Sequence, residues 1–469
     1  MAGKEADNST PLVAKETELY MKRWLVACLL FLSGFLVQFA WHFFGVINET
    51  LSEHFGVSQK TIDWLTLSAG VGEVIAGPVI GYLFSLKPTV VKIWYVGTTS
   101  VLTVTFAICA FVIYVGKYVF ICIVAEVAVG FVCAVFYALG PVTATVWFGE
   151  MEQATVLGIG WFATMAAVIV ASSMPVVLFG ENIDLSDKMN RVALLLLAMS
   201  ILGGISSLIV CLVIPNLPKL PPSHAELQRL SIAKRADQDN YKTTLLRFAK
   251  ETKYVITDRT SFTLVLMFSI IEGVFVSEYM LVPANESELK LGNSTLLSDD
   301  ATDISVNRGF VLTSYSIGGI VGSIGMGVIV DRLKSYNPVA NIISFSICVN
   351  VVLAMLTFIY NIKVLEYISN FMYGLSMMSF YPFIQEMLKQ HVYPTVQEST
   401  QGILVSLIGS VFCVLLPIII RAVMTQFGKL QFYVIVLILF IIIQILTVSI
   451  KPEMKRFKYE NEAIDGNKK

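Results

Sequence analysis

Charged residues are scarce in this sequence. Only 14% of its 469 residues are Asp, Glu, Lys or Arg, whereas 56% are hydrophobic, and the formal net charge is −1. A soluble globular chain carries about 25% charged residues. A nearly neutral chain also lacks the basic excess that binds nucleic-acid phosphates. The composition therefore excludes an ordinary soluble protein and gives no sign of a nucleic-acid partner.

The motifs of several enzyme classes are also missing. The chain has no GxxxxGK[ST] phosphate-binding loop and no HExxH metal-hydrolase signature. Its seven cysteines all fall within apolar runs and none has a CxxC partner, so neither a disulfide framework nor a zinc site is expected. We therefore expect no enzyme activity, no metal and no cofactor.

Long apolar runs dominate what is present. A helix needs about 20 apolar residues to cross a bilayer, whereas a barrel strand needs about 10 with an alternating pattern. The polar N-terminal segment has no apolar signal-peptide core, so the first run is predicted to be a retained span. Twelve runs are long enough for helices: about 24–47, 62–83, 91–115, 118–144, 153–178, 191–214, 262–283, 307–330, 338–360, 363–388, 398–424 and 430–450. The sequence predicts an all-α membrane protein with twelve transmembrane helices.

A long polar connection divides these spans six and six. Its opening, PNLPKLPPS, ends the sixth helix, and the following SHAELQRLSIAKR predicts a surface helix. Transporters use two six-helix halves around a central loop. The predicted parts are a cytoplasmic tail (1–23), a six-helix half (24–214), a central cytoplasmic loop (215–261), a second six-helix half (262–450) and a C-terminal cytoplasmic tail (451–469).

Orientation is predicted from Lys and Arg placement. With both termini cytoplasmic, most of the 33 basic residues lie on the cytoplasmic side, as the positive-inside rule requires. The sequons at Asn48, Asn285 and Asn293 then fall on the opposite side, where glycosylation is possible. We expect a monomer in a lipid bilayer, and the lysosomal membrane and the plasma membrane both remain open.

Two pairs of short segments suggest an internal repeat. WFGEMEQATVLGI leads into the fifth span and YPTVQESTQGIL into the eleventh, and setting Trp147 against Tyr393 places Glu152 on Glu398. A carboxylate at a helix start is favoured by the helix dipole. GYLFSLK (81–87) after the second span likewise corresponds to GVIVDRLK (327–334) after the eighth.

GVIVDRLK resembles a loop motif of the major facilitator superfamily, which repeats it after spans two and eight. Gly327, Asp331 and Arg332 match the motif, whereas the first copy has Ser85 where the acidic residue is expected. The resemblance implies the major facilitator fold. Four charged residues at cytoplasmic helix ends are predicted to pair across the halves and to close an inner gate: Asp331, Arg332, Glu152 and Glu398.

Within that superfamily the chain resembles solute carrier family 49. RWLVACLLFLSGFLVQFAWHFFGVI resembles its first helix, and FGVSQKTIDWL, TVWFGEMEQATVLGIG and YPTVQESTQGIL match other segments of its feline leukaemia virus subgroup C receptor-related proteins. PNLPKLPPSHAELQRLS is more similar to the lysosomal member disrupted in renal carcinoma 2. The resemblance implies a transporter, with choline and ethanolamine, haem, or pyridoxine as candidate substrates.

The resemblance also implies parts of a substrate site. Trp41 matches a first-helix tryptophan that lines the choline site of the receptor-related proteins. Their pocket tyrosine in helix seven falls on Val276, one turn from Tyr279, and their glutamine in helix eleven falls on Gly409. Trp41 and His42 form an aromatic stretch that suits a cationic or aromatic substrate, because ring faces attract cations. An interfacial aromatic belt is the alternative for this stretch.

Four acidic residues lie within the predicted spans, where a charge is costly. Glu272 and Glu278 lie in FSIIEGVFVSEY, and Glu73 and Glu126 lie in spans two and four. Six residues of helix rotate Glu278 by about 120° from Glu272, so the two do not share a face. No basic residue lies deep in any span. All four are candidates for proton coupling, and Glu272 and Glu126 are also candidates for binding a cation, while a buried structural carboxylate is the alternative.

For several other residues within the predicted spans, a structural role is the first interpretation. Tyr315 is included among the substrate candidates, although it and the other polar aromatics more often form core. Those others are Tyr137, Trp161, Tyr373 and Tyr381. The glycines of span eight predict a face on which another helix packs closely: Gly318, Gly319, Gly322, Gly325 and Gly327.

These patterns together predict a secondary transporter. It moves a small organic cationic or aromatic solute, choline/ethanolamine-like or pyridoxine-like, by alternating access between the halves. Facilitated diffusion and proton coupling both remain open. The alternatives are a haem exporter or importer of the same family, and a membrane receptor that has kept the fold without transport. Only His42 among four histidines lies in a span, which disfavours axial haem ligation.

Overall fold

Helices form almost all of the described chain. The computed structural model describes residues 17–87, 91–179, 183–236, 240–284, 301–333, 336–360, 362–428 and 430–466. Within these ranges there is no strand, which confirms the predicted all-α fold class. The helices are α1 (Lys22–Val46), α2 (Asn48–Phe55), α3 (Gln59–Leu86), α4 (Val91–Val115), α5 (Val119–Trp147), α6 (Gln153–Leu178), α7 (Leu185–Val213), α8 (His224–Ala236), α9 (Tyr241–Thr257), α10 (Arg259–Ala284), α11 (Ala301–Leu333), α12 (Tyr336–Tyr360), α13 (Lys363–Val392), α14 (Glu398–Phe427), α15 (Leu430–Ser449) and α16 (Lys455–Gly466).

Eleven helices of the described ranges are long and apolar enough to cross a membrane. They are α1, α3–α7, α10–α12, α14 and α15. The remaining predicted span, 363–388, which is the tenth along the chain, lies in α13, a helix of 30 residues. Polar side chains such as Asn370, Ser379 and Gln385 interrupt its apolar middle, and Ser379 and Gln385 are buried against other helices. Composition alone therefore supports eleven spans, and α13 is a long helix of lower hydropathy.

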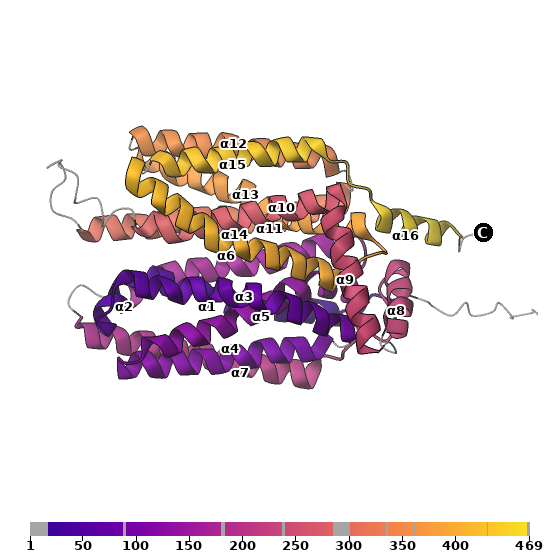
Figure 1. Ribbon diagram of the computed structural model, residues 1–469, viewed down its shortest axis with the longest axis horizontal. Helices are drawn as coiled ribbons and strands as arrows, with labels where there is room; N and C mark the ends of the chain where they lie inside the picture. The colour runs from indigo at the N-terminus through magenta and orange to yellow at the C-terminus, as the bar shows by residue number, and fades with distance from the viewer. Residues whose placement is uncertain are drawn as a thin grey trace, which may run out of the picture.

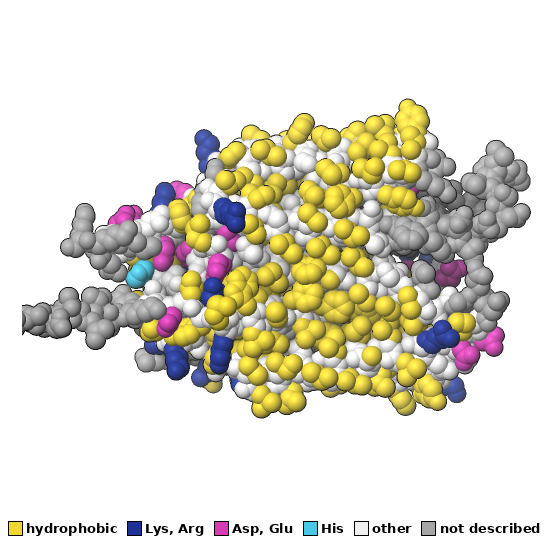
Figure 2. All heavy atoms as spheres, turned by 180° about the vertical axis from the view of Figure 1, so that it is seen from behind, with side chains coloured by type: hydrophobic (Ala, Val, Ile, Leu, Met, Phe, Trp, Pro, Cys, Tyr) yellow, Lys and Arg dark blue, Asp and Glu magenta, His cyan; other side chains and the backbone are white. Residues whose placement is uncertain are grey.

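The long helices run side by side along one axis (Figure 1). Helices α4 and α7 lie on one side of the bundle, α12 and α15 on the opposite side, and α3, α6, α11 and α14 between them. Apolar side chains cover the middle of the face shown in Figure 2, and charged side chains gather towards its two ends. This belt is what a multi-pass membrane protein exposes to lipid.

The two ends of the bundle differ. At one end lie α8, α9 and α16 together with the start of α1, and we call this the α8–α9 end. The short helix α2 lies at the opposite end, which we call the α2 end. The predicted surface helix in SHAELQRLSIAKR is confirmed as α8, whereas α9 was not predicted.

Close packing explains the glycines of α11. A Cβ atom on Gly318 would lie 2.0 Å from the Phe371 carbonyl oxygen, and one on Gly322 would lie 2.1 Å from that of Leu375. Both contacts are with α13, so the predicted glycine face is confirmed for this pair of helices. A Cβ atom on Gly327 would lie 2.6 Å from the Ala154 carbonyl oxygen of α6, so α11 also packs closely on a helix from the first half of the chain.

Candidate functional site

Glu272 lies halfway along α10, buried among other helices. Its Oε1 accepts a hydrogen bond from the hydroxyl of Tyr137 on α5. The hydroxyl of Tyr381 on α13 lies near the same carboxyl group, but it and Glu272 Oε2 are outside hydrogen-bonding geometry with any described residue. Buried polar atoms of this kind usually have partners. Glu272 therefore presents one occupied and one available oxygen.

A second carboxyl group lies close to the first. Glu73 of α3 accepts a hydrogen bond from the Ser406 hydroxyl of α14, and it is near enough to Glu272 for the two charges to interact. In the part of the chain that the structure describes, no basic side chain pairs with either of them. Two buried acids without a fixed counter-charge favour a proton or a cationic ligand.

Aromatic rings surround Glu272 on the side of the α8–α9 end. The ring of Trp161 on α6 stacks on that of Tyr381 with 3.9 Å between centroids, and Phe268, one turn before Glu272, meets the Tyr381 ring edge-on at 5.1 Å. The Trp161 indole donates a 3.1 Å hydrogen bond to Gln385. Helices that precede the central connection (α5, α6) and helices that follow it (α10, α13) thus meet on the α8–α9 side of the carboxylate.

A second aromatic group lies towards the α2 end. His42 of α1 and Tyr315 of α11 flank Phe275 of α10, with centroid distances of 5.5 and 6.3 Å. Tyr315 then meets Tyr373, whose hydroxyl donates to Glu278. Glu278 and Glu272 have different partners, as their 120° separation predicts. His42 Nδ1 lies 2.7 Å from the Gln38 carbonyl oxygen of its own helix.

Trp41 and Gly409 are two residues whose family counterparts are implied to line the substrate site. The Trp41 side chain is buried, and its indole N–H has no hydrogen-bond partner among the described residues. Trp41 lies 3.8 Å from where a Cβ on Gly70 would stand. A Cβ on Gly409 would meet only Glu272, at 3.8 Å, which is ordinary contact. Position 409 therefore places no side chain against Glu272.

Glu126 lies elsewhere. Both of its oxygens are buried and make no hydrogen bond to a described residue, and the titratable group nearest to it is the Cys122 thiol. Eleven residues of α5 separate it from Tyr137, which is on the order of 16 Å along the helix axis. Glu126 therefore does not join the group around Glu272.

Three of the predicted residues cannot be placed. The side chain of Tyr279 lies outside the described part of the chain, as do Asn285 and Asn293. Asn48 begins α2, and its side-chain amide donates a 2.6 Å hydrogen bond to Asp63.

The predicted gate residues all lie at the α8–α9 end. Asp331, at the end of α11, accepts hydrogen bonds from the backbone N–H groups of Ala154 (3.0 Å) and Thr155 (2.8 Å) in the first turn of α6. Glu152 pairs at 3.0 Å with Arg23, which belongs to the same set of six spans. Arg332 is exposed. Asp331 is therefore the member that directly joins the two sets of spans.

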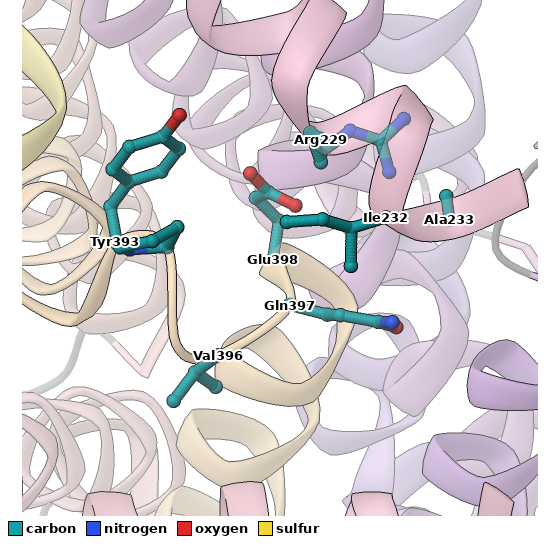
Figure 3. A pocket seen from close by; sticks show the side chains of 8 residues that line it. Arg229, Ile232, Ala233, Tyr393, Val396, Gln397 and Glu398 are labelled. Carbon is teal, nitrogen blue, oxygen red and sulfur yellow. The ribbon is translucent and has the colours of Figure 1, made fainter. Parts of the chain in front are cut away.

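The fourth gate residue, Glu398, is joined to the other set of spans by the C-terminal helix. Arg456 of α16 is completely buried and pairs with Glu398 at 3.0 Å and with Glu150, between α5 and α6, at 2.5 Å. In Figure 3 the Glu398 carboxylate points between Tyr393 and the α8 residue Arg229. Sequence reasoning missed Arg456, because nothing in the basic tail distinguishes this arginine from its neighbours.

No group of three or more His, Cys, Asp or Glu side chains that could hold a metal ion occurs among the described residues. The chemistry available near Glu272 is therefore that of carboxylates, hydroxyls and aromatic rings.

The family follows from a comparison of the whole sequence. The model of the Major Facilitator Superfamily matches residues 30–396. The chain belongs to the major facilitator superfamily. This confirms the resemblance that GVIVDRLK suggested, and it makes the chain a multi-pass membrane protein of a transporter superfamily rather than of an enzyme family.

Relatives of this superfamily member confirm the predicted likeness to solute carrier family 49. The choline/ethanolamine transporter flvcr2b of Danio rerio is 22% identical over 94% of this chain and 86% of its own length. The choline/ethanolamine transporter FLVCR2 of Homo sapiens is 23% identical over 95% of this chain and 80% of its own. The uncharacterized MFS-type transporter C09D4.1 of Caenorhabditis elegans is 24% identical over 94% of this chain and 71% of its own.

Solved structures of the superfamily share the fold. The proton:xylose symporter XylE aligns with a TM-score of 0.64 at 13% identity, over 94% of this chain and 98% of its own. The fucose:proton symporter FucP of E. coli aligns with a TM-score of 0.63 at 13% identity, over 91% of this chain and 98% of its own. At this identity the similarity concerns the fold alone.

Proposed function

We propose that this protein is a secondary transporter for a small organic cationic or aromatic solute, choline/ethanolamine-like or pyridoxine-like. The supporting observation is Glu272, a buried carboxyl group with one available oxygen and no basic partner among the described residues. Relatives named as choline/ethanolamine transporters support the same class of substrate.

The surrounding side chains suit such a ligand. A cation beside Glu272 gains the Coulomb attraction of a carboxylate in a poorly hydrated setting. Aromatic rings such as those of Trp41 and Trp161 supply apolar contact and attract the cation through their faces. A proton on Glu272 or Glu73 competes with the ligand for the same charge, so either acid is a candidate for coupling transport to protons.

Transport by alternating access needs a gate at each end of the bundle. We propose that Asp331, Glu398 and Arg456 close the α8–α9 end and that this end faces the cytoplasm, as the basic residues near it favour. The carrier would then bind its substrate between the two sets of six spans, near the middle of the membrane.

Uptake into cells tests this proposal. Cells expressing the protein, with surface labelling to confirm its location, are given radiolabelled choline, ethanolamine and pyridoxine at outside pH 5.5 and 7.5. We expect uptake of at least one compound and a loss of about 10-fold to 100-fold in Glu272→Gln, because a hydrogen bond to a charged group contributes about 1.5–3 kcal/mol.

Glu126→Gln is the matched control, since it neutralises a buried acid about 16 Å along α5 from Tyr137, the hydrogen-bond partner of Glu272. It should transport like the parent. Acid stimulation that disappears in Glu272→Gln would assign proton coupling to this residue. Absence of uptake of all three compounds by surface-expressed protein, or normal uptake by Glu272→Gln, would contradict the proposal.

A further inference from the structure

Asp331 joins α11 to α6 at the α8–α9 end. Its two carboxylate oxygens accept the N–H groups of Ala154 and Thr155, and one oxygen also accepts the Thr155 hydroxyl at 2.7 Å. The first N–H groups of a helix have no partner within the helix, so an acceptor there stabilises the helix start. Because α11 and α6 belong to different sets of spans, this cap also holds the end closed.

The internal repeat predicts a second cap of this kind. The alignment that places Glu152 on Glu398 also places the start of α6 on the start of α14, and Asp331 on Ser85. Ser85 has one neutral oxygen on a short side chain where Asp331 has two carboxylate oxygens, and its hydroxyl donates to the Gly81 carbonyl of its own helix at 2.9 Å. The equivalent acceptor is therefore missing from α3.

Ser85 nevertheless faces the start of α14. A Cβ on Gly77 would lie 3.1 Å from Leu407, and a Cβ on Gly81, one turn further along α3, would lie 3.1 Å from Ile403, one turn earlier in α14. Extending this register by one turn in each helix predicts that Ser85 lies on the side of α3 that faces Ser399, with Phe248 of α9 packed beside Gly81. The helices pack as the repeat predicts, and only the acidic side chain is absent.

Helix α9 supplies an oxygen at this place. Glu251 is buried, and its Oε2 accepts the Thr400 hydroxyl at 2.6 Å and the Gln397 backbone N–H at 3.3 Å. One turn earlier, Arg247 donates to the Ser85 carbonyl oxygen at 2.7 Å. Helix α9 therefore binds the end of α3 with one residue and the start of α14 with the next on the same face.

We propose that Glu251 replaces the acidic residue that the first motif copy lacks, and that the central connection thereby forms half of the gate at the α8–α9 end. Glu251 is a positioning residue, since it acts on α14 and not on a substrate. The proposal goes beyond the proposed transport and depends on it only in assuming that this end opens and closes.

The test measures opening without any substrate. Cys28 and Cys211, the two exposed cysteines among the described residues, are changed to Ser, and Ser399→Cys introduces a thiol at a buried position of α14. Labelling of the purified protein by a fluorescent maleimide in lipid nanodiscs then reports opening. We expect Glu251→Ala to raise the labelling rate about tenfold, because it removes the two hydrogen bonds that join α9 to Gln397 and Thr400.

Rescue separates gating from a general structural role. Ser85→Asp combined with Glu251→Ala should restore slow labelling, because the acidic residue then stands where the repeat expects it and beside Arg247. Ser85→Leu introduces a side chain of similar shape to Asp but without a hydrogen-bond acceptor, so it should not restore slow labelling. Glu251→Gln should label slowly, since its amide oxygen still accepts the Thr400 hydroxyl.

Asp331→Asn serves as the positive control in the other half of the repeat. Fast labelling in Asp331→Asn together with slow labelling in Glu251→Ala would overturn the proposal, as would slow labelling in both. Failure of Ser85→Asp to restore slow labelling would also overturn it. Because no substrate is used, these results are independent of whether the uptake experiment succeeds.

Discussion

At the scale of single residues, Glu272 determines which ammonium compounds should bind best. Its Oε2 makes no hydrogen bond to a described residue, so an ammonium group with an N–H can donate to it, whereas the trimethylammonium group of choline cannot. A buried acceptor left unsatisfied costs about 1–3 kcal/mol. In competition experiments, ethanolamine and its N-methyl and N,N-dimethyl derivatives should each inhibit uptake of the radiolabelled substrate. The concentration that each needs for half-inhibition should be about fivefold or more below that of choline.

All four compounds carry one positive charge at neutral pH, so this series separates hydrogen bonding from charge. In Glu272→Gln the preference should shrink towards equality. A parent protein that binds choline best would show that the aromatic faces dominate recognition, and the assignment of Glu272 Oε2 as a ligand acceptor would then be wrong.

The candidate site could be predicted only in part from the residues themselves. Glu272 and Glu73 stand out in the sequence because a carboxylate within an apolar run is costly. Their hydroxyl partners do not, since Tyr137 and Ser406 lie 135 and 333 positions away along the chain. A tyrosine or serine in an apolar helix gives no signal of its partner, and only helix packing brings the two together.

At the scale of helices, α16 should contribute strongly to stability. Arg456 is buried between Glu150 and Glu398, and removing one member of a buried ionic group leaves uncompensated charge that costs about 3–5 kcal/mol. Arg456→Met should therefore lower the melting temperature of the purified protein clearly. Arg332→Ala, which removes an exposed arginine at the same end, should leave it nearly unchanged.

Neutralising the two carboxylates that lose their partner should reverse the effect of Arg456→Met on the melting temperature. The triple variant Arg456→Met, Glu150→Gln, Glu398→Gln has no uncompensated charge, so it should regain much of the lost melting temperature. Equal melting temperatures for the single and triple variants would mean that Arg456 stabilises the end through packing and not through its charge.

Helices in polar segments were the least predictable elements. Apolar length predicted the spans because the bilayer imposes it, and α8 followed from its prolines and helix-forming residues. Neither length nor composition marked α9 or α16 as parts of a gate. Their importance comes from Glu251 and Arg456, whose buried contacts are made with residues at least 58 positions away.

At the scale of the whole molecule, the contacts of the described residues join early and late helices with different strength at the two ends. At the α2 end, Arg421 of α14 pairs with Asp63 of α3 at 2.8 Å, and their side chains are 38% and 13% exposed. Exposed pairs contribute about 0–1 kcal/mol. The caps and the buried arginine of the α8–α9 end are worth more, so this end should control the equilibrium between the two access states.

That equilibrium should depend on pH through Glu251. The pKa of this carboxyl group is raised from 4.5 to about 7. Burial is the main cause and the neighbouring Glu398 adds to it, while the hydrogen bonds from Thr400 and Gln397 and the charge of Arg247 oppose the rise. In an open state that exposes Glu251 to water, the pKa returns towards 4.5. Between pH 4.5 and 7 the closed state therefore binds more protons, and acid favours closure.

Protonation of Glu251 stabilises the closed state relative to the open state. This contribution to the free-energy difference should fall by up to about 3 kcal/mol as the pH rises from 4.5 to 7, and by little more above 7. The Ser399→Cys labelling rate, corrected for the pH dependence of maleimide chemistry with a thiol on an exposed loop, should increase over that interval. Glu251→Gln cannot titrate at this position, so its corrected rate should stay flat. A parallel increase in Glu251→Gln would assign the pH dependence to another group at the α8–α9 end.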